Sequence, residues 1–435
     1  MVIIPEKLKV IILKLKNIVA VTSLLIYCNT TLYAEESQKR ERLHSVKEAI
    51  GQVTNMQQKE VSIVDNFKHM FEAAKVSGQI RVLYAGYNQK EIGVDDTYAN
   101  AVGGILKYEL AAYNGFNAGV AVYTSHDIPF TTGDGTKHNS ELSSSNGDYT
   151  TVGEAYINYN YKDLNFRAGR QQLDTPLADS DDIRMIQNSF EAYVATYDYN
   201  GFNFMAGRIN SWQGIDAGLD DGWSATGKNG TNFGGVAYND IYELNLWYYN
   251  ITDATNALYF DTGINYALSD TVSVHAMMQL LKENELAQSG YDADIYGGML
   301  ELLVGGVGLN FAYNTTDASN NKQTFSGTGG GTLYTSLDTT TLDVIAIDRE
   351  AQALVSGISY NYDNLNFLYA YGAFIGDKDS NAKKAYIVEQ NIGLEYNINE
   401  EFILSAIYII EEDRESKVKT ENDWNRAQLM IHYNF

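Results

Sequence analysis

From Val76 to the C-terminus, apolar and polar residues alternate with a period of two. This alternation predicts β-strands that have one apolar and one polar face. Turn signals separate the alternating segments, so we predict eighteen strands of roughly ten residues each. Their expected limits are 76–88, 98–113, 116–125, 150–161, 164–172, 189–199, 202–210, 231–239, 241–250, 256–267, 271–283, 291–303, 307–315, 350–362, 365–374, 386–397, 400–410 and 423–435.

Three segments repeat one aromatic hairpin pattern: residues 159–166 (YNYKDLNF), 197–204 (YDYNGFNF) and 360–367 (YNYDNLNF). In each, aromatic residues alternate with polar ones around a two-residue turn. Asn200-Gly201 suits such a turn because both central residues need a positive φ. The flanking rings would form an aromatic girdle at a membrane interface. A soluble β-sandwich could contain one such hairpin, but the repeats favour a transmembrane barrel.

The even strand number and the loop lengths predict the orientation of this barrel. Both chain ends would lie on the periplasmic side, with eight short turns there and nine longer loops outside. In the last strand, one face carries Ala427, Leu429, Ile431 and Tyr433. The other face is mainly polar and includes Arg426. The terminal Phe435, together with Tyr433, resembles the signal that the outer-membrane barrel assembly machinery recognises.

The N-terminal residues differ from the barrel segment. Residues 1–34 contain a lysine-rich start, a short apolar stretch and a small residue before Glu35, which predicts a secretory signal peptide. Residues 35–75 have helical spacing, and we interpret them as a periplasmic helical extension or a linker. The barrel would then occupy residues 76–435. The expected fold class is all-β: an antiparallel transmembrane barrel of about eighteen strands.

Composition agrees with an exported barrel. The chain has 33 Tyr and only 3 Pro, and proline disrupts sheet interiors. The only cysteine, Cys28, lies in the expected signal peptide, so the mature chain would have no disulfide or thiolate metal site. Residues 1–34 carry a net charge of +3, so a total of −24 becomes −27 after cleavage. A charge this negative argues against nucleic-acid binding.

Strand alternation also predicts which charged side chains line the interior of the barrel. Acidic candidates outnumber basic ones, which predicts a mild preference for cations. The acidic candidates are Glu109, Glu154, Glu243, Asp261, Glu389 and Glu395, and the basic ones are Arg81, Lys107 and Arg426.

Three other functions are open to a barrel of this kind. An enzyme is disfavoured because none of the six histidines lies in a nucleophile or metal-binding motif. Calcium at acidic outer loops (Asp134 with Glu141, or Asp216 with Asp220 and Asp221) is a weaker alternative, and we expect no other metal or cofactor. A surface-exposed structural or adhesin-like barrel is the main alternative, because the loops at 126–149, 211–230 and 316–348 are long and rich in small polar residues.

A family resemblance emerges at residues 167–191, RAGRQQLDTPLADSDDIRMIQNSFE. The Gly-x-Gln, Pro-Leu, Ser-Asp and Phe elements, in this order, resemble the OprD-like outer-membrane porin family. The helical leader is similar to that of porins from epsilonproteobacteria. The resemblance implies an eighteen-stranded porin in a Gram-negative outer membrane, where it lies among lipid and lipopolysaccharide. Small hydrophilic solutes and ions would diffuse through it passively.

The resemblance further implies that the third outer loop folds inward and narrows the pore. By the strand count, this loop is residues 173–188. Its charged residues and two arginines of the preceding strand are therefore candidates for the constriction, where charges of opposite sign would face each other. These candidates are Arg167, Arg170, Asp174, Asp179, Asp181, Asp182 and Arg184. The resemblance leaves the permeant solute open, as well as the choice between a monomer and a homotrimer.

Overall fold

The computed structural model describes residues 62–325, 327–416, 420 and 422–435. They belong to the larger of two compact units of the chain, residues 43–435. The expected signal peptide at 1–34 and most of the expected extension at 35–75 lie outside the described residues. No helix in the described part of the chain is long and apolar enough to cross a membrane.

One antiparallel sheet contains almost all of the strands. In the described residues it has nineteen members, of which β10 (Ser224–Ala225) is only a short addition beside β9, so eighteen strands form the wall. These are β1 (Lys75–Gln89), β2 (Thr97–Glu109), β3 (Phe116–Asp127), β4 (Asp148–Tyr161), β5 (Leu164–Gln171), β8 (Ser189–Tyr199), β9 (Phe202–Gln213), β11 (Thr231–Asn239), β12 (Tyr242–Ile251), β13 (Thr255–Ser269), β14 (Val272–Glu285), β15 (Ala293–Val304), β16 (Val307–Thr316), β17 (Ala351–Tyr362), β18 (Leu365–Gly376), β19 (Ala385–Asn397), β20 (Phe402–Asp413) and β21 (Trp424–Asn434).

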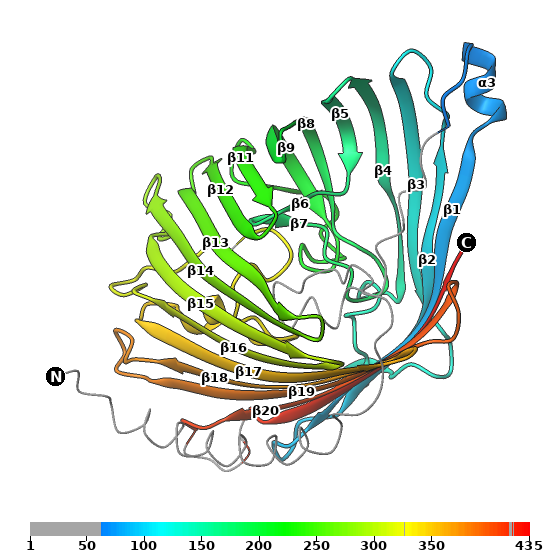
Figure 1. Ribbon diagram of the computed structural model, residues 1–435. Coiled ribbons are helices and arrows are strands. Elements are labelled where there is room, and N and C mark those ends of the chain that lie inside the picture. The colour runs from blue at the N-terminus through cyan, green and yellow to red at the C-terminus, as the bar shows by residue number, and fades with distance from the viewer. Residues whose placement is uncertain (1–61, 326, 417–419, 421) are drawn as a thin grey trace. The chain divides into compact units, whose positions relative to one another are not determined.

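The wall closes on itself. Each strand pairs with its neighbours in the sequence, and β1 pairs with β21 from Gln79↔Asn434 to Gln89↔Trp424. Figure 1 shows the C-terminal end of the chain beside the first strand. The predicted closed barrel of eighteen strands is therefore confirmed, and the limits of β8 and β11 agree with the predicted limits at both ends.

The connections alternate in length as predicted, with one exception. Eight short turns lie at the end of the barrel where the chain enters, and nine connections lie at the other end. Eight of these nine are longer than every short turn, whereas the connection 252–254 has only three residues. Asn200 and Gly201 form one of the short turns with φ values of 49° and 83°. Both values are positive, as a tight hairpin of this kind requires. The predicted turn geometry is thus confirmed there.

The two faces of the wall differ in exposure. Outward side chains such as Leu106 and Ile157 are 53% and 62% exposed, although both are apolar. The inward Arg81 is fully buried. An apolar outer face and a polar inner face are typical of a barrel surrounded by lipid.

Smaller elements lie outside the wall. The helix α3 (Phe67–Glu72) precedes β1, and its Met70 carbonyl accepts a hydrogen bond from the Ala111 amide. The short α4 (Leu342–Ile345) and the 3-10 turn η2 (Gly135–Lys137) belong to long connections. A two-stranded hairpin, β6 (Asp174–Thr175) and β7 (Ala178–Asp179), lies between β5 and β8.

A charge on the lipid face should destabilise this barrel according to its depth. We expect Val82→Arg, whose position is exposed near the middle of β1, to lower the free energy of unfolding by about 2–4 kcal/mol in lipid vesicles. Tyr161→Arg, beside a short turn, is the matched control and should cost roughly 0–1 kcal/mol. Denaturant titration of both variants measures the difference. Equal losses would contradict the assignment of the two depths.

Candidate functional site

The nine predicted lining residues all lie on the inward face of their strands, opposite to the lipid-exposed positions. On one side of the barrel, the Lys107 ammonium lies 2.7 Å from the Glu154 carboxylate. Glu109 accepts a hydrogen bond of 2.6 Å from the Tyr156 hydroxyl. These contacts join β2 to β4 across the inner face of β3.

Other inward carboxylates are distributed around the wall. Glu243 lies 3.0 Å from His275 Nε2, and Asp261 accepts a 2.6 Å hydrogen bond from Tyr259. Glu395 accepts a hydrogen bond from Asn366 at 3.1 Å. Glu389 accepts hydrogen bonds from residues of a long connection, described below. Acidic groups therefore occur on nearly every side of the interior.

Arg81 fixes the third long connection to the first strand. Its Nη1 and Nη2 atoms both donate to Asp182, each at 2.6 Å. Nη1 also donates to the Arg184 carbonyl. A bidentate contact between guanidinium and carboxylate holds its partner in a defined orientation. Residues 182–184 are thus attached to the inner face of β1.

Arg426 joins two further connections to the last strand. Its guanidinium is fully buried and lies 2.6 Å from Glu141 and 2.9 Å from Asp338. Glu141 belongs to the connection 128–147, and Asp338 belongs to the connection 317–350. Burial alone would raise the pKa of Glu141, but the nearby Arg426 and Arg184 outweigh it and hold this pKa below its usual value.

Residues 173–188 contact opposite sides of the barrel. The Leu177 amide donates to the Tyr249 hydroxyl on β12 at 3.3 Å. The Ile183 carbonyl accepts from Gln428 on β21 at 3.2 Å. Around the eighteen-stranded wall, β12 and β21 are nine strand positions apart, which is half of the circumference. This connection therefore bridges the interior.

The connection 317–350 also enters the interior. The Thr332 carbonyl accepts from Gln279 on β14 at 2.7 Å, and the Thr340 amide donates to Glu389 on β19 at 2.7 Å. From its composition we expected residues 316–348 to be a long outer loop. The structure differs because their hydroxyl and main-chain groups find partners on the inner wall. Leu333, Leu337 and Leu342 are buried there as well.

The two bridging connections enclose a space of about 480 Å³. Charged residues of both signs line this space. Arg184 is the basic residue, and Asp216, Asp338 and Asp343 are the acidic residues. Three aromatic residues, Tyr87, Trp212 and Phe325, also line this space. The Nε and Nη1 atoms of Arg184 are buried and have no hydrogen-bond partner among the described residues.

The constriction candidates separate into groups. The Asp182 carboxylate is bound to Arg81 on β1, and Arg184 lines the space between the two bridging connections. Asp179 and Asp181 shape the turn before them, with the Asp181 amide donating to Asp179 at 3.0 Å. Asp174 is exposed in β6. Arg167 lies over the inward Tyr156 ring, at 4.4 Å from its centroid.

Arg170 lies on the other face of β5 from Arg167, apart from the other constriction candidates. It is three residues from Arg167, and positions an odd number of residues apart face opposite sides of a strand. The Arg170 guanidinium lies over the Trp223 ring at 4.5 Å, and its Nε is 4.0 Å from Glu191. Its face of β5 is the one that carries the exposed Leu164 and Phe166.

Sequence reasoning missed several inward acidic residues. Glu283, Glu301 and Glu411 share the inward parity of their strands, so the period of two would have identified them. Glu411 accepts a 2.8 Å hydrogen bond from Thr340. No sequence signal points to Asp338, because it lies far from any strand in the sequence.

The acidic outer loops use their carboxylates internally. Asp220 accepts hydrogen bonds from the amide and hydroxyl of Ser145, at 3.0 and 3.1 Å, and thereby joins two connections. Asp216 accepts from Asn188 at 2.7 Å. Within the described residues, no group of three or more His, Cys, Asp or Glu side chains is arranged to hold a metal. Calcium at these loops stays a prediction.

Known structures have the same architecture. The chain is similar to OpdK of Pseudomonas aeruginosa crystallised with vanillate, at 16% identity and a TM-score of 0.72, covering 84% of this chain and 99% of that one. It is also similar to a BenF-like porin from Pseudomonas fluorescens Pf-5, at 15% identity and a TM-score of 0.73, with the same coverage. OccAB2 of Acinetobacter baumannii has 15% identity and a TM-score of 0.72, again with 84% and 99% covered. No curated protein sequence matches the chain.

A closed barrel of eighteen strands with a polar interior and inward connections defines an outer-membrane porin. The family model described as outer membrane porin, OprD family, matches residues 51–345, which is more than half of the chain. The chain therefore belongs to the OprD family. This membership confirms the expected location in a Gram-negative outer membrane, and it makes the protein a channel for small solutes and not an enzyme.

Removal of the Arg426 charge should destabilise the interior. Arg426→Gln leaves Glu141 and Asp338 without their buried partner, and such a loss costs about 3–5 kcal/mol. We expect a lower unfolding temperature and faster cleavage of the connection 317–350 by a protease. Arg208→Gln, on a strand far from this cluster, is the control. Unchanged stability of Arg426→Gln would show that the two connections are held by other contacts.

The lowered pKa of Glu141 sets a pH dependence. A depressed pKa in the folded state contributes stability above the unfolded pKa, and this stability is lost as the pH falls through the folded pKa. The stability difference between the wild type and Glu141→Gln should therefore be constant from neutral pH to pH 5 and shrink below about pH 4. Thermal unfolding of both proteins across this range provides the measurement. A difference that shrinks already near pH 6 would contradict the contact with Arg426.

Proposed function

We propose that the protein allows passive diffusion of small hydrophilic solutes and ions through a pore that residues 173–188 narrow. The contact of this segment with β12 on one side and β21 on the other carries the proposal. A segment attached to both halves of the wall divides the cross-section of the interior. The connection 317–350, which contacts it through Thr328 and Leu177, narrows the opening further.

The charge inside the pore supports a mild cation preference. The two inward arginines Arg81 and Arg426 each form an ion pair with a carboxylate at 2.6 Å. Glu109 and Glu395 accept hydrogen bonds from neutral side chains instead. Uncompensated carboxylates on a pore wall attract cations and repel anions.

Arg184 gives the narrow region a second property. Its guanidinium borders the space between the two bridging connections, and two of its nitrogen atoms have no hydrogen-bond partner in the part of the chain that the structure describes. Opposite charges on two sides of a narrow passage orient polar solutes. Hydrophilic solutes with hydrogen-bond acceptors would therefore pass in preference to apolar ones.

The structural or adhesin-like alternative depends on free outer loops. Three of the long connections are instead largely buried against the inner wall: 128–147, 173–188 and 317–350. Each contains a buried leucine, namely Leu142, Leu177 and Leu337. Planar-bilayer recording distinguishes the two functions. A correctly inserted protein without channel current would refute the proposed transport.

The C-terminus supports the proposed contact with the barrel assembly machinery. Phe435 pairs with Gly78 through two main-chain hydrogen bonds of 3.1 Å, and its ring stacks on Tyr433 with centroids 6.0 Å apart. The terminal aromatic pair thus lies at the seam where β1 and β21 close the barrel.

Loss of the Arg184 charge should increase cation selectivity. A unit charge about 8 Å from the ion path contributes roughly 0.5 kcal/mol in water, which is about a twofold change in the permeability ratio. We expect Arg184→Gln to shift the reversal potential in a KCl gradient toward the potassium equilibrium potential. Lys162→Gln, at a short turn, removes the same charge outside the pore. An anion-selective wild type would refute the cation preference.

Release of the Asp182 contact should widen the pore. Asp182→Asn weakens the bidentate contact with Arg81, so the segment 173–188 should fluctuate and single-channel conductance should rise with more current noise. Asp163→Asn at a short turn is the matched control. If conductance and noise equal those of the wild type, this segment does not form the constriction.

A further inference from the structure

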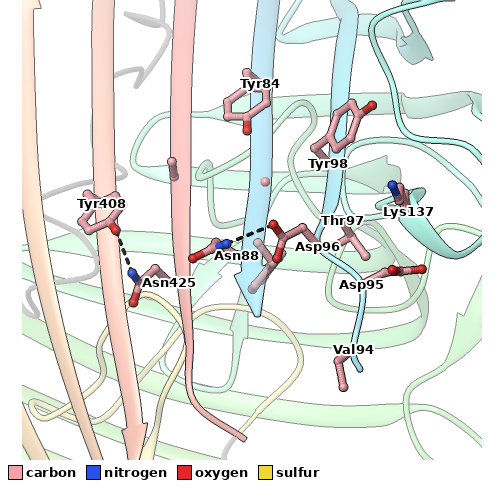
Figure 2. A pocket seen from close by; sticks show the side chains of 13 residues that line it. Tyr84, Asn88, Val94, Asp95, Asp96, Thr97, Tyr98, Lys137, Tyr408 and Asn425 are labelled. Atoms are coloured by element: carbon pink, nitrogen blue, oxygen red, sulfur yellow. Dashed lines mark hydrogen bonds between the residues drawn. The ribbon is translucent and has the colours of Figure 1, made fainter. Parts of the chain in front are cut away.

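A hollow of about 560 Å³ lies on the lipid-facing side of the barrel, near the outer ends of β1, β2, β20 and β21. Figure 2 shows it with Tyr84, Tyr98 and Tyr408 around it and polar side chains toward the outer end of β1. Tyr84, Tyr98 and Tyr408 lie on the outward face of their strands, whereas Tyr87, which also lines the hollow, lies on the inward face of β1. Tyr98 and Tyr408 are 38% and 40% exposed.

Small residues create the hollow. In the register of the sheet, Tyr408 pairs with Ala427, Ala427 with Gly86, and Gly86 with Tyr98. Two large rings therefore flank two positions with almost no side chain. The Tyr84 ring lies over Gly86, where an added Cβ would meet the Tyr84 hydroxyl oxygen at 2.4 Å. The result is a notch with aromatic sides, which we call the tyrosine notch.

The tyrosine notch lies at the outer membrane interface. On β2, the outward Tyr98 and Tyr108 are ten residues apart. Ten residues span roughly 33 Å along a strand. At a tilt of about 40° this corresponds to about 25 Å across the membrane, the height of the apolar band between two aromatic girdles. Tyr108 is next to a short turn, so Tyr98 marks the girdle on the other side.

Polar groups occupy the rim just beyond this girdle. Asn88 donates to Asp96 at 3.0 Å, and the Gln89 amide donates to the same carboxylate at 2.8 Å. Asp96 is thus engaged within the β1–β2 connection. The Asn425 amide contacts the Tyr408 hydroxyl at 2.8 Å.

Two lysines lie at this rim, together with the carboxylates of Asp95 and Asp96 that line the hollow. The Lys90 ammonium lies between the amides of Asn88 and Asn425, 3.2 Å from the latter. Lys137 lies on the other side of the hollow, beyond Tyr98 (Figure 2). Both lysines are exposed. Cationic groups beyond an aromatic girdle attract the anionic headgroups of membrane lipids.

We propose that the tyrosine notch binds the phosphorylated amino-sugar headgroup of the outer-leaflet glycolipid. Tyrosine rings offer flat apolar surfaces with a polar tip, which suits the faces and hydroxyls of a sugar ring. Asn88 and Asn425 can exchange hydrogen bonds with sugar hydroxyl and amide groups. Lys90 and Lys137 pair with a phosphate. The medium at this height is the glycolipid leaflet itself, so the occupant is always present at high local concentration.

The test uses the full-length protein, refolded in detergent without lipopolysaccharide and titrated with diphosphoryl lipid A. Native mass spectrometry counts the bound lipid A molecules. Ala427→Leu fills the notch, and Ala206→Leu makes the same change on the lipid face of β9 as a control. We expect Ala427→Leu to weaken binding at least about tenfold and Ala206→Leu to bind like the wild type.

A second variant separates charge from shape. Lys90→Gln with Lys137→Gln should weaken binding of diphosphoryl lipid A by roughly tenfold or more, and binding of dephosphorylated lipid A much less. Both are exposed positions, so folding should be unaffected, and the shift between heated and unheated protein on a gel checks this. Single-channel conductance of Ala427→Leu should equal that of the wild type, which separates this proposal from the pore.

Three outcomes would overturn the proposal. Wild-type binding by Ala427→Leu would place the lipid elsewhere. Equal loss for diphosphoryl and dephosphorylated lipid A in the lysine variant would exclude a phosphate at the rim. A change in oligomeric state of Ala427→Leu with unchanged lipid A binding would assign the notch to a second copy of the chain.

Discussion

The need to pair every backbone amide and carbonyl inside a membrane is the constraint on which this structure depends. Lipid offers no hydrogen bonds, so a sheet in a membrane must close on itself. Here closure occurs between β1 and β21, over eleven residue pairs from Gln79↔Asn434 to Gln89↔Trp424. Closure gives every strand two neighbours, and alternation along the strands then assigns one face to lipid and the other to the interior.

Closure also explains why the interior contains connections. An eighteen-stranded barrel is too wide for its own side chains to fill. Arg81 and Arg426 are fully buried on the inner face, and buried guanidinium groups require anionic partners. Asp182, Glu141 and Asp338 provide these partners, and each comes from a different long connection. Two arginines on adjacent strands thus attach three connections to one side of the wall.

The sequence was sufficient to predict the strands but not the interior. Strand positions depend on local alternation and on turn residues such as Asn200 and Gly201, so a single sequence contains them. The contact between Arg426 and Glu141 joins residues 285 positions apart, and no local pattern encodes it. The connection 317–350 resembles a flexible surface loop in composition. Its glycines instead permit close packing, since a Cβ at Gly329 would lie 2.4 Å from the Asp179 carbonyl oxygen.

The charge of the pore interior depends on which inward side chains form ion pairs within the protein. The basic side chains Arg81, Arg426 and Lys107 are engaged in short contacts with carboxylates that hold the structure together. Inward carboxylates such as Glu109 and Glu395 accept hydrogen bonds from neutral side chains. The Arg184 carbonyl accepts a hydrogen bond from Arg81, and the Arg184 guanidinium borders the space between the two bridging connections. Arg81, Lys107 and Arg426 therefore hold the wall and its connections together, whereas the Arg184 guanidinium borders the internal space.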